Sequence, residues 1–137
     1  MGDISLTAAN IRALQANGAV VRSYDAGEDL TVGNVVYIAS DGDEEKAQAT
    51  AQASAKGFGI VVESYDGETS INDGDRCSVC VFGPVSGFSS MTPGDTIYVS
   101  DTEGKLADSA GTYSHVMGRA ERAGVLWVDP AQADPSS

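Results

Sequence analysis

Few residues in this sequence have the types and spacing that chemistry requires. Cys77 and Cys80 are separated by two residues, a spacing found in redox and zinc motifs. They lie in a β-forming run, 76–82, where side chains three positions apart point to opposite faces of a strand. We therefore predict two buried or half-buried thiols rather than a disulfide or a metal site. His115 is the only histidine, and it cannot complete a tetrahedral zinc site alone.

Carboxylates are the other candidates, because the chain contains 20 Asp and Glu residues. Most of them lie among turn-forming residues, where solvated side chains are expected. Segments 41–45 and 72–75 concentrate oxygen ligands, but neither follows the twelve-residue calcium loop with its Glu at position twelve. No nucleophile elbow or phosphate-binding loop occurs. We predict no metal, no cofactor and no enzymatic activity, with a carboxylate-pair enzyme left as a minor alternative.

The composition indicates one globular domain. The 137 residues are 42% hydrophobic and 20% charged, which is enough apolar material for a single core. A net charge of −12 argues against nucleic acid as a partner, because phosphates would be repelled. The longest apolar run extends only from Val79 to Val85, far short of the roughly 20 residues that span a bilayer. No secretory leader is visible, so we expect assembly in a cytoplasm and no membrane partner.

Short β-branched and aromatic runs separated by Gly, Asp, Asn and Pro predict a mainly β fold, a small barrel or sandwich, over residues 25–130. The Ala- and Gln-rich segment 47–56 is expected to be an ordered loop, with a short helix as the less favoured outcome. The polar tail 131–137 is expected to be mobile. The predicted strands are 20–23, 34–39, 59–64, 76–82, 85–88, 96–100, 116–121 and 125–129.

An internal repeat is the most informative pattern. Residues 30–40 align with 91–101 at an offset of 61, so that Tyr37 matches Tyr98. Residues 58–61 align with 117–120 at an offset of 59. Each unit contains a glycine turn before its Tyr strand. We predict a pseudo-duplicated domain in which each half covers the apolar face of the other, and in which the two tyrosines occupy equivalent core or barrel-lining positions.

The N-terminal segment, residues 1–24, differs from the rest because Asp3, Arg12 and Arg22 are its only charges. Its pattern favours one short helix from about Thr7 to a stop at Gly18. A helix of about ten residues is marginal alone, so it needs a surface to pack against. We predict that this arm attaches to a partner, and packing on its own domain is the alternative. The predicted attachment residues are Ile4, Leu6, Ile11, Arg12, Leu14 and Arg22.

The segment from Thr92 to Leu106, the run Gly111 to Ala120 and the ending Val125 to Pro130 resemble the C-terminal half of capsid cement, or head decoration, proteins of tailed bacteriophages. Gly83-Pro84-Val85 also sits where those proteins carry Gly-Pro-Val after a strand. The resemblance covers residues 25 to 130, and it rests on the order and spacing of ordinary strand and turn segments. Residues 1–24 depart from the shorter family pattern.

This resemblance implies a non-enzymatic β protein on the outer surface of a phage head. It would bind the major capsid protein and stabilise contacts between capsid subunits, as a homotrimer. Trp127, Val85 and Phe88 are the residues we expect at contacts between its own subunits. A carbohydrate-binding or host-adhesion module of a virion is the alternative, although the sequence offers few exposed aromatic candidates for it.

Overall fold

The computed structural model describes residues 2–136, in which regular structure is almost entirely β. This confirms the mainly β prediction. The strands are β1 (Ser5–Leu6), β2 (Arg12–Ala13), β3 (Val20–Asp25), β4 (Leu30–Thr31), β5 (Val35–Ile38), β6 (Glu44–Lys46), β7 (Gly59–Ser64), β8 (Ser70–Ile71), β9 (Arg76–Ser86), β10 (Phe88–Ser89), β11 (Thr96–Val99), β12 (Leu106–Ala107), β13 (Val116–Arg122) and β14 (Val125–Val128).

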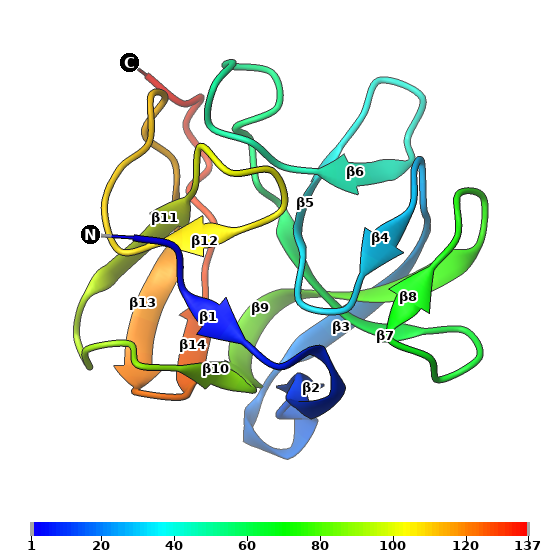
Figure 1. The fold of residues 1–137 in the computed structure, drawn as a ribbon, viewed down its shortest axis with the longest axis horizontal. Helices are drawn as coiled ribbons and strands as arrows, with labels where there is room; N and C mark the ends of the chain where they lie inside the picture. The colour runs from blue at the N-terminus through cyan, green and yellow to red at the C-terminus, as the bar shows by residue number, and fades with distance from the viewer. Residues whose placement is uncertain (1, 137) are drawn as a thin grey trace.

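Strand β9 lies between two halves of a curled antiparallel sheet (Figure 1). The strand order is β12-β11-β13-β14-β9-β7-β5-β6, and β2 and β3 also pair with β9. The first part of β9 pairs with β3 and β7, whereas its last residues pair with β2 and β14. Two small sheets therefore share one long strand, which is consistent with a small barrel or sandwich.

The predicted repeat is visible in the strand register. Val36 of β5 pairs with Gly59 of β7, and Ile97 of β11 pairs with Gly118 of β13. These are the residues that the sequence alignment makes equivalent. On both sides the order is the same: a short strand, the Tyr strand, the glycine-containing strand, then the strand at the junction. The internal duplication is therefore a property of the fold.

The turns before the Tyr strands are also equivalent. The Gly33 amide donates to the Val61 carbonyl at 2.7 Å, and the Gly94 amide donates to the Ala120 carbonyl at 2.7 Å. The two glycines have φ values of 101° and 91°, in the left-handed region that side chains with a Cβ rarely adopt. Glycine is thus required at both turns because each needs a positive φ.

The two halves also meet at their outer ends. The Gly104 amide donates to the Ala47 carbonyl at 2.7 Å, and the Ala49 amide donates to the Ser100 carbonyl at 2.9 Å. These bonds connect the chain after β6 to the loop before β12. The far ends of the curled sheet are therefore joined by backbone hydrogen bonds.

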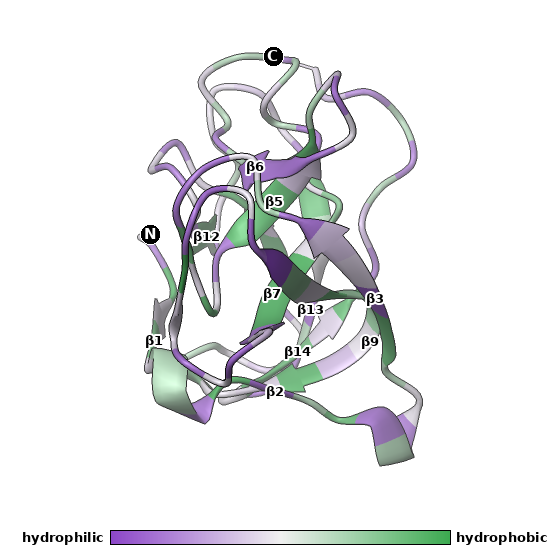
Figure 2. Ribbon diagram, turned by 90° about the vertical axis from the view of Figure 1, so that its right-hand side faces the viewer, coloured by the Kyte–Doolittle hydropathy of each residue, from purple (hydrophilic) through white to green (hydrophobic). Residues whose placement is uncertain are grey.

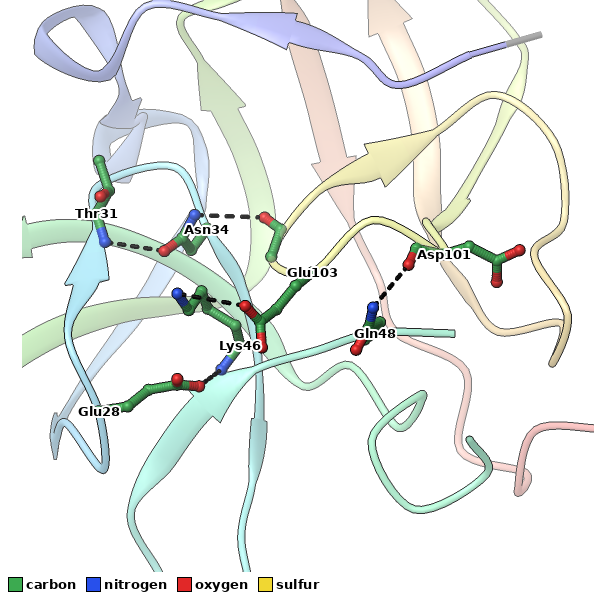
Figure 3. Close-up of polar contacts among 8 residues, drawn as sticks. Glu28, Thr31, Asn34, Lys46, Gln48, Asp101 and Glu103 are labelled. Carbon is green, nitrogen blue, oxygen red and sulfur yellow. Dashed lines mark hydrogen bonds and ion pairs between the residues drawn. The ribbon is translucent and has the colours of Figure 1, made fainter. Parts of the chain in front are cut away.

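Side chains reinforce this connection (Figure 3). Gln48 donates from Nε2 to the Asp101 carbonyl at 2.9 Å, and the Lys46 ammonium lies 3.5 Å from the Glu103 carboxylate. Segment 47–56, which joins β6 to β7, is an ordered loop with turns and no regular helix, as expected. It positions the residues that hold the two halves together.

The core fills the interior of the curled sheet. Its fully buried side chains come from both halves and from β9, and they include Val35, Ile60, Val79, Ile97 and Leu126. In Figure 2 most of the hydrophobic colouring lies in the central strands, and much of the hydrophilic colouring lies in the surrounding loops. One core therefore serves both halves. Tyr37 and Tyr98 are each only half-buried, so the repeat places them equivalently but at its margin.

The predicted N-terminal helix is wrong. The segment forms two single 3₁₀ turns, Ala8–Asn10 and Gln15–Asn17, with β2 between them. Pairing of Ala13 with Val85 holds this segment on β9 in extended form, and Ile11 is fully buried. Tertiary pairing and burial outweigh the weak helical preference of a short segment.

One strand boundary also differs from expectation. The predicted strands 76–82 and 85–88 are one continuous strand through Gly83-Pro84, and the break falls at Gly87, whose φ is 108°. Mobility of the tail, residues 131–137, stays a prediction; in the structure the Ser114 amide donates a hydrogen bond to the Ser136 carbonyl at 2.8 Å. The tail therefore lies against the loop before β13.

Replacing Ile11 with Ala tests whether the N-terminal segment belongs to the core. Because the side chain is fully buried, Ile11→Ala is expected to lower the free energy of unfolding by about 2–5 kcal/mol. Ile38→Ala is the matched control, because Ile38 is 46% exposed on β5, and it should change stability by about 0.5 kcal/mol or less. Urea unfolding of both variants measures the difference, and equal effects would contradict the core assignment.

Candidate functional site: an aromatic face of the sheet

The cysteines are not a reactive pair. Both are free and buried, as the sequence predicts. Burial raises the pKa of Cys77 to about 11, and it also raises the pKa of Cys80. Both thiols therefore remain protonated at neutral pH and are weak nucleophiles.

His115 is a core residue. It is 4% exposed, and its Nε2 lies 3.0 Å from the Gly57 carbonyl oxygen, while Nδ1 has no hydrogen-bond partner. Burial lowers its pKa, so the ring is neutral at physiological pH. Its hydrogen bond holds the loop that precedes β7 against the second half of the molecule.

The acidic segments do not assemble a metal centre. Among residues 2–136, no group of three or more His, Cys, Asp or Glu side chains is arranged to hold a metal ion. One carboxylate departs from the prediction of solvated turn residues. Glu44 is fully buried on β6, neither of its carboxylate oxygens has a hydrogen-bond partner, and desolvation raises its pKa to about 7. Strand β6 was not predicted, so its burial could not be anticipated.

The residues expected to attach the N-terminal segment to a partner differ in how deeply the structure buries them. Ile4 is 8% exposed and Ile11 is fully buried, so both are committed to this chain's own core. Leu6 is half-buried against that core. Packing on its own domain, the alternative we left open, is therefore what the structure shows for the apolar side chains nearest the N-terminus. Leu14 is half-buried, and Arg12 and Arg22 are exposed.

Two of the three predicted subunit contacts are also internal. Val85 is fully buried and Phe88 is 6% exposed. The register explains this: Val85 pairs with Leu126 on the inward face of the sheet. Trp127 is one residue further along β14 and therefore belongs to the opposite, outward face, where it is partly exposed.

Trp127 stands at the centre of an outward aromatic cluster. Its ring contacts Phe82 edge to face, with ring centroids 5.3 Å apart. Phe82 is 40% exposed and pairs with Val20, which is 47% exposed. Two strands that flank β9 and β9 itself thus present large apolar side chains on one surface.

The indole lies between two hollows. One, of about 530 Å³, is lined on the β13 side by residues that include Val116, Arg119 and Asp129. The other, of about 220 Å³, is lined by residues that include Leu14 and Arg122. Trp127 lines both hollows, so it forms a ridge between two recesses.

Arginines border this cluster. Arg12 pairs with Ser86, Ser86 pairs with Val125, and Val125 pairs with Arg122, which places these side chains in one row across the sheet. Arg119 pairs directly with Trp127. Three of the five arginines in the sequence therefore lie on this surface. We call it the Trp127 face, and it consists of Arg12, Leu14, Val20, Phe82, Arg119, Arg122, Val125 and Trp127.

Sequence reasoning identified Trp127, Leu14 and Arg12 but assigned them to separate roles. It missed Phe82, Arg119 and Arg122 because only the cross-strand register brings them together.

No protein-family model matches the chain, and no match was found among curated proteins. None of the helices in residues 2–136 is long and apolar enough to cross a membrane.

Proposed function

We propose that this protein is a capsid decoration, or cement, protein of a tailed bacteriophage. It binds the outer surface of the icosahedral head and stabilises contacts between major capsid subunits. The observation that carries the proposal is the order of the second half. The segments that resemble cement proteins form its turn, β11, β12, β13 and β14, which are consecutive parts of one half-sheet.

The physical basis of such a function is many weak contacts acting together. A domain of 14.1 kDa presents limited surface to a partner. A closed trimer multiplies the contacts and gains avidity without requiring any one of them to be strong. We therefore include a homotrimer in the proposal.

Light scattering and co-sedimentation test this function. The purified chain should sediment with empty, expanded heads of the phage that encodes it, and bound heads should resist heating better than bare heads. The mass in solution or on the head should correspond to three chains of 14.1 kDa. Failure of the intact, folded chain to sediment with heads would exclude the decoration function, and bound single chains would exclude the trimer.

A further inference from the structure

We propose that the Trp127 face is the surface that docks on the head. It fits a protein surface where apolar side chains are flanked by carboxylates. This inference rests on the proposed function, since it takes the assembled head as the partner, and it assigns the contact to particular residues.

Local charge supports an acidic partner surface. The whole chain carries −12, yet Arg12, Arg119 and Arg122 border the apolar cluster. Among the described residues, neither Arg12 nor Arg119 forms an ion pair. Arg12 donates to the Ala9 and Ile11 carbonyls, and Arg119 donates to the Gly94 carbonyl. These guanidinium groups are oriented by backbone oxygens, and their charges are left for a partner's carboxylates.

The acidic residues on this surface are few. Glu121 lies 3.9 Å from Arg122, and both side chains are substantially exposed. Such an exposed pair contributes little and can exchange for a carboxylate of the partner. Asp129 lines the larger hollow beside Trp127. Arg12 also lines a separate hollow that contains Glu63 and Glu68. Around Trp127 itself, Arg119 and Arg122 are matched by Glu121 and Asp129, so this surface is close to neutral although the whole chain carries −12.

Shape and residue type support docking by a protein. Trp and Arg are the side chains most enriched among residues that dominate binding energy at protein interfaces. The Trp127 ring is held by Phe82 and stands on a sheet, so little ordering cost remains to be met on binding. The hollows on either side can accept two side chains of the partner. The other large exposed apolar side chains, Ile38 and Tyr65, lie on β5 and after β7, outside this face.

Binding of single variants to empty heads tests the inference. Trp127→Ala should weaken binding by about 30-fold, as expected for a dominant interface residue. Arg119→Glu should also weaken binding, and its effect should be larger at low salt concentration than at high salt concentration. At low salt the reversed charge repels the partner's carboxylates more strongly, because it is less screened. Tyr65→Ala and Lys105→Glu are the matched controls: Tyr65 is 68% exposed, Lys105 is exposed, and neither belongs to the Trp127 face. Both controls should bind within about twofold of the unmodified chain.

The outcomes separate the two proposals. If the unmodified chain does not bind heads, the proposed function is wrong and the docking assignment falls with it. If the unmodified chain binds, and Trp127→Ala and Arg119→Glu bind as well as their controls, only the docking assignment is wrong. Light scattering covers a third outcome: conversion of the trimer to monomers by either variant would make this face a contact between copies and overturn the assignment. Because Arg119 is exposed, Arg119→Glu remains informative even if Trp127→Ala is poorly folded.

Discussion

Glu44→Gln is expected to stabilise the protein progressively as the pH rises above about 5. The carboxyl is fully buried on β6, and its pKa is raised from 4.5 to about 7, chiefly by desolvation and then by the charge of Asp43. The titratable neighbours that interact with it from β3 and β9 are Tyr24 and Cys77, neither of which is a cation. These neighbours therefore leave its negative charge uncompensated.

The sign follows from proton linkage. A carboxyl whose folded pKa lies above its unfolded value favours folding when protonated, so its contribution is fully present below pH 4.5 and is lost as pH rises through about 7. The stability difference between Glu44→Gln and the unmodified chain should therefore grow by about 3 kcal/mol between pH 4.5 and pH 8.

Urea unfolding at a series of pH values measures this difference. Glu63→Gln is the control for the same substitution at an exposed position, on β7. A Glu44→Gln difference that does not vary with pH would show that Glu44 is not a buried, proton-binding carboxyl in the folded protein.

Gly118→Ala is expected to have an even more severe effect on folding. A Cβ at this position would overlap the carbonyl oxygen of Trp127 on β14, and the residue has a φ of 154°. The clashing atom belongs to the backbone of a paired strand, so it cannot move away without breaking the β13–β14 ladder. We expect a loss of about 3 kcal/mol or more, measured as a lower urea midpoint or as failure to recover folded protein.

The repeat supplies a second position for this prediction. A Cβ on Gly59 would lie 2.5 Å from the Cys80 carbonyl oxygen on β9, so Gly59→Ala should also be strongly destabilising. Gly2→Ala is the control, since a Cβ on Gly2 would have no other atom within 4 Å beyond its chain neighbours. If Gly118→Ala unfolded at the same urea concentration as Gly2→Ala, the close strand approach in the second half would be incorrect.

Sequence patterns predicted the central strands well because these strands are β-rich and bounded by glycine turns. The prediction for 59–64 agrees with β7 at both ends, and 116–121 and 125–129 differ from β13 and β14 by one residue. The short strands β6 and β12 were missed because two or three residues cannot show a periodicity of two. Their positions are set by pairing with the Tyr strands, which is a tertiary effect.

The candidate site was less predictable than the fold. Trp127 could be proposed as a contact residue from its type alone. Its outward orientation depends on register, because Val85 and Leu126 occupy the inward positions of the same pair of strands. Arg119 and Arg122 belong to another strand and reach the face only through their pairing with Trp127 and Val125. A shift of the strand pairing by one residue would have turned the inward side chains of the strand outward and the outward ones inward.

Because both repeats pair with strand β9, the two halves of the molecule are expected to fold and unfold together. Each half-sheet is completed by a different part of this one strand, which also pairs with β2 and β3. Neither repeat can separate from the other without losing its pairing with β9. A load applied to one half of the protein therefore passes through continuous backbone to the other half, rather than across a hinge between two independent lobes.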